Sequence, residues 1–236
     1  MSKTQIARLQ IELRLVRQPL AWMITLLYLL LLFTMVTGSP DAPRPVYYYN
    51  EMAMFVFAVM TTVLLFHNEI GGNGMEVIAS YPISLARLTM RKWLLCLVAL
   101  GLAEVGWTTV YCLKYGTVTT LMYTWKDTSS LVGTHAAALF IQALPSYMLM
   151  SALTLAGIIV TRTLYGGMAA GFGYWMLDSI SSGDLLKDYT LYTAYLPEQA
   201  SFSWNRTVYV TASLILLAGS AWLASRRHRW ISREEE

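Results

Sequence analysis

Acidic residues inside apolar stretches are the side chains of this sequence that could do chemistry. Glu104 stands near the middle of an apolar run, residues 93–113, where a charge is costly in lipid unless it faces protein or water or stays protonated. It is either a substrate or proton site or a buried acid hydrogen-bonded to a neighbouring helix, and both interpretations stay open. Glu51 lies at one end of another apolar run, where we expect it to be solvated or paired with a Lys or Arg.

Motifs typical of self-contained enzymes do not occur in the sequence. It has no G-x-S-x-G nucleophile elbow, no H-E-x-x-H metal site and no E-E-x-x-x-R pair within an apolar run. His67, His135 and His228 are isolated, and no Cys/His cluster accompanies them. Cys96 and Cys112 fall on one expected helix, about 24 Å apart, and cannot form a disulfide. We expect no catalytic residue, no metal and no cofactor in this chain.

The composition indicates an integral membrane protein. Of the 236 residues, 56% are hydrophobic and only 13% are charged, and the mean hydropathy is +0.47. A soluble domain has about a quarter of its residues charged, so the outside of this protein must be largely apolar and face lipid. The net charge of +3 gives no indication of nucleic-acid binding.

Apolar runs long enough for membrane helices predict an all-α fold with six spans in one transmembrane domain. A helix needs about 20 residues to cross a bilayer. The expected spans are residues 20–37, 49–66, 93–113, 135–160, 164–177 and 207–224. The bundle then covers residues 20–225 and is followed by a charged tail, 226–236.

Three further segments have recognisable patterns. Residues 1–19 have apolar side chains at helical spacing among Arg and Glu, which predicts an amphipathic helix lying in the membrane interface. Gly167 and Gly171 form a G-x-x-x-G pair, which favours close approach of helix backbones. Residues 178–205 are apolar but lack a continuous span, so we expect a partly re-entrant outer loop.

The distribution of Lys and Arg predicts the orientation. With the N-terminus inside and six spans, twelve of the 17 cations are cytoplasmic and five are outside, as the positive-inside rule requires. Both termini are then cytoplasmic. The inner cations are Lys3, Arg8, Arg14, Arg17, Arg87, Arg91, Lys92, Arg162, Arg226, Arg227, Arg229 and Arg233, and the outer ones are Arg44, Lys114, Lys126, Lys187 and Arg206.

A polar stretch between the second and third spans predicts a short, capped helix. Glycines at 71, 72 and 74 allow a sharp turn, and Glu76 follows where a helix dipole favours negative charge. Pro82 ends the helix, because the residue before a proline avoids helical geometry. The stretch runs in the order Glu69, Gly74, Met75, Glu76, Pro82, Ile83, Ser84, Arg87, Arg91 and Lys92.

This order of residues resembles the first cytoplasmic loop of type-2 ATP-binding-cassette (ABC) transporter permeases. In that family an acidic residue, a Gly-x-Glu step and a Pro-x-Ser step precede a basic residue that opens the third span. The interfacial helix, the six spans and the short glycine-rich fifth span extend the resemblance over the chain. It implies a coupling helix at residues 74–81 that docks on an ATPase subunit. The implied coupling residues are Glu69, Gly74, Glu76, Pro82 and Arg87.

The resemblance also implies a permease dimer, made of two identical or two related chains, with a central path lined mainly by spans two and five. Candidate path residues are Glu51, Met60, Glu104, Gly167, Gly171 and Tyr174. The sequence has no G-x-x-x-x-G-K-[ST] phosphate loop, so ATP and Mg²⁺ would be bound by a separate ATPase subunit.

The expected function is that of an exporter permease in a bacterial cytoplasmic membrane. It would move an amphipathic or hydrophobic solute, such as a peptide, an antibiotic or a lipid, outward by alternating access. The expected partners are the ATPase subunit, a second permease and the lipid bilayer. We expect no binding to nucleic acid. The alternatives are a membrane-embedded enzyme of the intramembrane-protease kind and a non-transporting membrane partner, such as an immunity protein.

Overall fold

A computed structural model describes residues 18–39, 46, 48–72, 74–116, 118–120, 132–134, 136–196 and 199–230. Most of the interfacial helix expected over residues 1–19, and residues 231–236 of the expected tail, lie outside this described part. The described elements are α2 (Pro19–Thr37), the π-helical η2 (Tyr48–Ala53), α3 (Met54–Phe66), the π-helical η3 (His67–Gly71), α4 (Gly74–Ser80), α5 (Leu85–Tyr115), β1 (Val118–Thr120), β2 (Val132–Thr134), α6 (Ala136–Thr161), α7 (Leu164–Ser181), the 3₁₀ turns η4 (Lys187–Tyr189) and η5 (Thr193–Tyr195), α8 (Gln199–Ser225) and the 3₁₀ turn η6 (Arg227–Arg229).

Five helical segments of the described chain are long and apolar enough to cross a membrane. They are Pro19–Thr37, Tyr48–Gly71, Leu85–Tyr115, Ala136–Thr161 and Ser201–Ser225. The chain is therefore a multi-pass helical membrane protein. The sixth expected span, residues 164–177, is also a helix, α7, but it is not among the five because glycines and the polar residues at its end make it less apolar.

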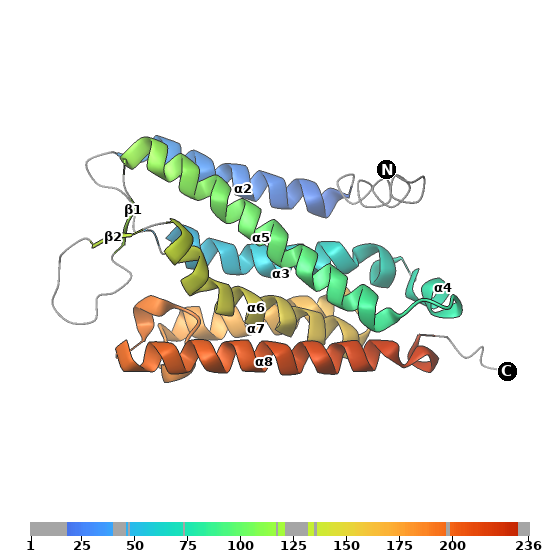
Figure 1. Ribbon diagram of the computed structural model, residues 1–236. Coiled ribbons are helices and arrows are strands. Elements are labelled where there is room, and N and C mark those ends of the chain that lie inside the picture. The colour runs from blue at the N-terminus through green and yellow to red at the C-terminus, as the bar shows by residue number, and fades with distance from the viewer. Residues whose placement is uncertain are drawn as a thin grey trace.

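The long helices lie side by side, with α4 at one end and the β1–β2 hairpin at the other (Figure 1). We call these the α4 end and the hairpin end. Helix α6 is central, since it packs against α3, α5, α7 and α8. Helix α2 packs only its inner side, through Ile24, Tyr28, Leu31 and Leu32, on the main hydrophobic core.

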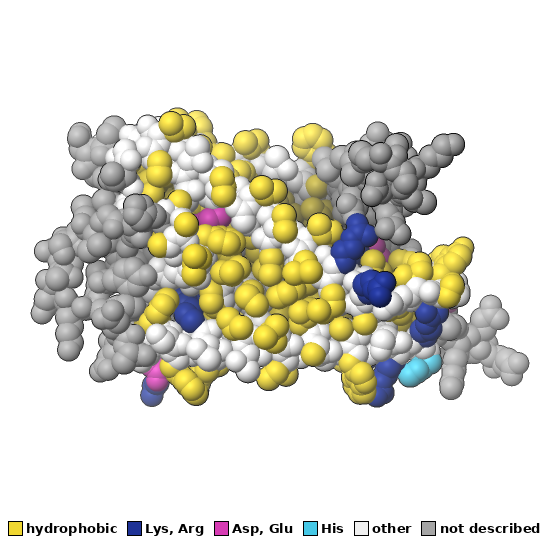
Figure 2. Space-filling view, in the orientation of Figure 1, with side chains coloured by type: hydrophobic (Ala, Val, Ile, Leu, Met, Phe, Trp, Pro, Cys, Tyr) yellow, Lys and Arg dark blue, Asp and Glu magenta, His cyan; other side chains and the backbone are white. Residues whose placement is uncertain are grey.

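The outer surface of the bundle is apolar. Large hydrophobic side chains stay exposed along the helices, for example Trp22 and Leu30 on α2 and Leu102 and Leu113 on α5. Figure 2 shows hydrophobic side chains across the middle of the visible face, with most of the Lys and Arg toward the α4 end. Contiguous apolar surface of this extent would associate in water but is matched by lipid tails.

Two helices begin about two turns before their expected spans. Helix α5 begins at Leu85 rather than near residue 93, because Ser84 caps it and its side chain accepts a hydrogen bond from the Arg87 backbone N–H at 3.3 Å. Helix α8 begins at Gln199 rather than at residue 207. Polar first turns continue both helices past the apolar stretch that marks each span in the sequence.

The expected close approach at the glycine pair of α7 is confirmed. A Cβ atom added at Gly167 would lie 2.3 Å from Ile158 Cγ1 and 2.8 Å from the Thr154 carbonyl oxygen, both on α6. At Gly171 it would lie 2.4 Å from Thr154 Oγ1 and 2.7 Å from Val59 Cγ2. The two glycines therefore allow α7 to lie directly against α6 and α3.

Replacing Gly167 by alanine is expected to lower stability by about 1–3 kcal/mol, because the added methyl group overlaps the α6 backbone. Gly173→Ala is the matched control on the same helix, since nothing lies within 4 Å of its added Cβ. That control should leave stability unchanged or raise it by up to about 1 kcal/mol through helix propensity. The thermal unfolding midpoint in detergent measures both, and equal midpoints for the two variants would contradict this packing.

Candidate functional site

Helix α4 is a short helix at one end of the bundle, joined to the second membrane helix through η3. A Cβ atom added at Gly74 would lie 2.8 Å from the Asn68 carbonyl oxygen, so the turn into α4 requires a residue without a side chain there. Met75 and Ala79 are buried against a hydrophobic cluster that includes Trp93 of α5 and Trp230. The sequence predicted this helix over residues 74–81, within one residue of its observed end.

The other face of α4 and the turn after it are exposed. Glu76 points away from the core together with Val77, which is 59% exposed. The turn continues this surface with Tyr81 at 56% and Ile83 at 50% on either side of the exposed Pro82. We call residues 76–83 with these exposed side chains the α4 surface. An exposed apolar patch of this kind is typical of a surface that contacts another protein or the membrane.

Arg227, just after α8, fastens the end of α4. Its Nη1 donates to the carbonyl oxygens of Ala79 at 2.9 Å and Tyr81 at 2.6 Å, and its Nη2 donates to that of Ile83 at 2.9 Å. The last carbonyls of a helix have no intrahelical partner, and one planar guanidinium satisfies three carbonyls of this segment here. Residues far apart in the sequence thus hold α4 and its following turn in one position.

Further pairs fix the same end of the bundle. The expected coupling residue Glu69 forms an ion pair with Lys92 of α5, with 2.5 Å between Oε2 and Nζ. Arg229 Nη2 donates to the Val160 carbonyl at the end of α6 at 3.1 Å, and Arg162 Nη1 donates to the Arg229 carbonyl at 2.7 Å. The side chain of Arg87, another expected coupling residue, is exposed on the first turn of α5.

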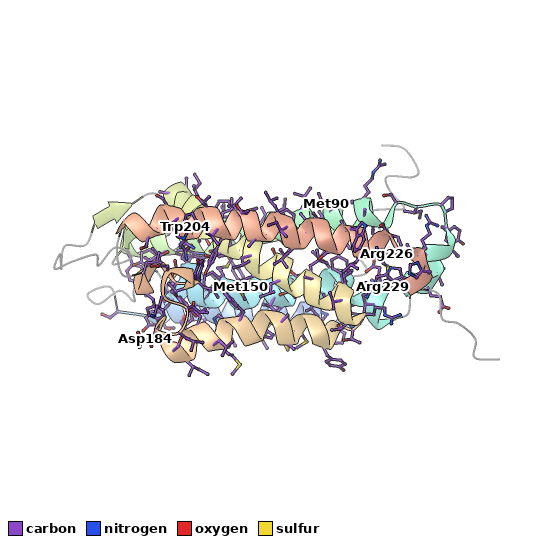
Figure 3. The ribbon with its side chains drawn as sticks, turned by 90° about the horizontal axis from the view of Figure 1, so that it is seen from below. Met90, Met150, Asp184, Trp204, Arg226 and Arg229 are labelled. Atoms are coloured by element: carbon purple, nitrogen blue, oxygen red, sulfur yellow. The ribbon has the colours of Figure 1, made fainter. Side chains whose placement is uncertain are left out.

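The described cations gather at the α4 end. Figure 3 shows Arg226 and Arg229 at this end and Asp184 and Trp204 at the other. Seven described cations belong to the α4 end, namely Arg87, Arg91, Lys92, Arg162, Arg226, Arg227 and Arg229. Those of the hairpin end are Lys114, Lys187 and Arg206.

A buried ion pair lies near the hairpin end. Glu51 is 0% exposed, so the expectation that it is solvated is wrong, while the expected pairing with a cation is confirmed: Arg206 Nη2 lies 3.9 Å from Glu51 Oε1. Thr193 bridges them, since its Oγ1 donates to Glu51 at 2.5 Å and accepts from Arg206 Nη2 at 2.5 Å. The Thr193 backbone N–H also donates to Glu51 Oε2 at 3.0 Å, and Arg206 donates to Ser146 Oγ. The network joins η2, α6, α8 and the segment before α8.

Glu104 forms a second buried network beside the first. Trp107 Nε1 donates to its Oε2 at 2.8 Å, and the Tyr147 hydroxyl of α6 donates to the same oxygen at 3.1 Å. The Asn50 amide, with its nitrogen toward Glu104, donates to Oε1 at 2.5 Å. The Tyr147 hydroxyl also contacts the Asn50 carbonyl. Of the two interpretations left open, this is the geometry of a buried acid hydrogen-bonded to neighbouring helices.

Residues 182–196, within the segment expected to be re-entrant, form turns that cover the ends of α7 and α8. Asp178 Oδ2 accepts from the Leu191 backbone N–H at 2.6 Å and from Thr190 Oγ1 at 3.0 Å. Tyr174, an expected path residue, donates to the Tyr189 carbonyl at 2.9 Å. Burial raises the pKa of Tyr192 to about 12, so this phenol stays neutral near pH 7.

The other expected path residues lie in the interior of this single chain. Met60, Gly167 and Gly171 are buried between helices, as are Glu51 and Glu104. The structure describes two large surface grooves, and none of the expected path residues lines either one. The partners that sequence reasoning did not identify are Arg206, Thr193, Tyr147 and Arg227. Only Arg206, which lies beside an apolar run, carries a signal in the sequence alone.

No family model, no curated protein and no solved structure matches this chain. The geometry described above is therefore the basis for a functional interpretation.

Removing Arg206 is expected to destabilise the protein strongly. Arg206→Gln leaves the Glu51 carboxylate buried without its cation, which costs about 3–5 kcal/mol in comparable pairs. Adding Glu51→Gln should restore part of this loss, because a neutral amide needs no counter-charge. A double-mutant cycle on unfolding in detergent measures the coupling, and additive effects would show that the two residues act independently.

Arg227→Ala is expected to loosen α4 without unfolding the bundle. Losing its hydrogen bonds should speed hydrogen exchange of the backbone amides in residues 78–81 by about tenfold or more, since each bond contributes about 1 kcal/mol. Arg226→Ala is the control, because Arg226 stacks on Trp222, 3.7 Å from the ring centre, and no hydrogen bond from its side chain to α4 is described. Equal exchange in the two variants would show that Arg227 does not hold α4.

Proposed function

We propose that this chain is the membrane subunit of an ATP-driven exporter and that the α4 surface is where a separate ATPase subunit acts on it. The observation that carries the proposal is a short helix that exposes an acid and apolar side chains at the cation-rich end of a membrane protein. The order of residues around this helix, from Glu69 to Lys92, also resembles the coupling loop of type-2 ABC permeases.

The anchoring of α4 fits the transmission of force. A segment that receives a mechanical force must move as a rigid unit, because local bending would otherwise absorb the displacement. Arg227 ties α4 to the end of α8, the Glu69–Lys92 pair ties η3 to α5, and Met75 and Ala79 pack on the core beneath. A displacement of the α4 surface is therefore passed to the ends of at least two long helices.

The charge distribution supports a cytoplasmic position for the α4 end. Seven described cations lie there and three lie at the hairpin end. Under the same topology, twelve of the 17 Lys and Arg of the whole sequence are cytoplasmic and five are outside. Loops rich in Lys and Arg stay in the cytoplasm, where ATP is available to a soluble ATPase. This orientation places both termini inside and the segment 182–196 outside.

The transport model requires a second permease copy. We propose that spans two and five, α3 and α7, of two identical or related chains form the central path, and that it alternates between inward and outward access. The cargo is an amphipathic or hydrophobic solute, and the membrane is the cytoplasmic membrane of a bacterium. The ATPase subunit binds ATP and Mg²⁺, and this chain contributes the path and the α4 surface.

The proposal can be tested by purifying the tagged full chain from its own membranes after crosslinking. Val77→Cys carries a short thiol-reactive crosslinker at the centre of the α4 surface, and Leu185→Cys carries it at an exposed site of the opposite end. We expect only position 77 to crosslink to a soluble protein that contains a phosphate loop and hydrolyses ATP. If the α4 surface crosslinks no such protein, or if cysteines there are labelled from outside the cell, the proposed function is wrong.

Reversing the charge of Glu76 should abolish ATP-dependent transport while the protein still folds, because the exposed carboxylate is part of the proposed docking surface. The matched control is Asp184→Lys, which makes the same charge change at an exposed site at the hairpin end. Efflux by proteoliposomes that contain the permease and its ATPase is the measurement. Wild-type transport by Glu76→Lys would remove the coupling role of this surface.

A further inference from the structure

A groove of about 700 Å³ opens between α2, α3 and α7 at the α4 end, away from the α4 surface. Its volume lies within the range of about 300–1,000 Å³ that is usual for small-molecule sites. Most of its wall is apolar and comes from three helices that are separate in the sequence. The apolar lining includes Leu20 and Met23 of α2, Val63 of α3, Ile70 of η3, and Leu164 and Met168 of α7.

One end of this groove is polar and cationic. Arg162, in the turn between α6 and α7, lines it together with Thr163 and His67. Arg162 uses Nη1 on the Arg229 carbonyl, and its guanidinium has further N–H groups to donate. His67 Nδ1 is buried and has no hydrogen-bond partner among the described residues. No Asp or Glu is among the described residues that line the groove.

The backbone adds to the positive character of this end. Helix α7 begins at Leu164, which lines the groove, and a helix N-terminus favours a negative charge beside it. Arg162 itself has φ 59°, in the left-handed region that a residue with a side chain rarely adopts. This conformation holds the arginine in the tight turn between the two helices, next to the first turn of α7.

We propose that this groove binds an anionic phospholipid, with the phosphate at Arg162 and His67 and an acyl chain along Met23, Val63 and Met168. The cation, the helix N-terminus and the lack of an acid among the described lining residues select a negative headgroup. The apolar wall favours a ligand with an acyl chain over a free phosphate ion, because a phosphate ion would leave the apolar lining of the groove without a contact. Placing the lipid in the cytoplasmic leaflet rests on the orientation given in the proposed function. The preference of the groove for an anionic lipid does not depend on that orientation.

Native mass spectrometry of the purified full chain in detergent tests this site. The probes are phosphatidylglycerol and phosphatidylcholine with the same acyl chains, added at equal concentrations. We expect phosphatidylglycerol to bind about tenfold more tightly, because both lipids carry the phosphate but only phosphatidylcholine adds a cationic choline group, which Arg162 repels. Arg162→Gln combined with His67→Gln should remove this preference. Arg91→Gln, an exposed cation at the same end and outside the groove, should retain it.

A second pair of variants tests the acyl-chain position and keeps the headgroup residues intact. Met168→Trp fills the groove and should weaken binding of both lipids about tenfold, whereas Met176→Trp, on the same helix but outside the groove, should not. Equal affinity for the two lipids, or equal loss in the Arg91 and Arg162/His67 variants, would overturn the proposal.

Occupation of the groove by a second copy of the chain is the remaining outcome. Tyr165 is 81% exposed at its edge, and Tyr165→Cys in a Cys112→Ala background would then form a crosslinked dimer that binds no lipid there. That result also overturns the proposal. The lipid measurements use the purified chain alone, so a failed search for an ATPase partner leaves their outcome unaffected, and the two proposals fail separately.

Discussion

Inside a bilayer a polar group has no water to bind, so every such group must find a partner within the protein. Hydroxyl side chains meet this constraint within their own helix, as Thr62 does by donating to the Ala58 carbonyl at 2.7 Å. The buried charges of Glu51 and Arg206 cannot be satisfied locally, because no single helix turn offers enough donors and acceptors. They are satisfied only when η2, α6, α8 and Thr193 come together, and this fixes the arrangement of the hairpin end.

The two ends of the bundle meet the constraint in opposite ways. At the hairpin end, the described side chains of Glu51, Arg206 and Asp178 are buried and bond to neighbouring groups of the protein. At the α4 end arginines bond to helix carbonyls and leave the α4 surface exposed. Under the proposed function, a soluble partner would reach the protein at this exposed α4 surface.

The positions of the helices could be predicted from the sequence, but the contacts between them could not. Apolar runs located each membrane helix, and the Gly74–Glu76–Pro82 pattern located α4, because these features depend on residues close together in the chain. The pair of Glu51 and Arg206 joins positions that are far apart, and one sequence shows no such pairing. Arg206 was assigned to an outer loop because the apolar run begins after it, although α8 already includes it. Arg227 could not be distinguished from the neighbouring arginines of the tail.

Helix α8 connects the two ends. Arg206 lies near its start in the buried network, and Arg227 follows its last turn and holds α4. At about 1.5 Å per residue these two arginines are about 30 Å apart, the thickness of the hydrocarbon core. A helix resists stretching, because its length is set by a continuous row of backbone hydrogen bonds. As long as the hydrogen bonds of Arg227 and the turn that carries it hold, a displacement of α4 along the helix axis moves α8, and with it the arginine that holds Glu51 and Thr193. In this way the geometry links the α4 surface to the buried network of Glu51, Thr193 and Arg206 through one helix.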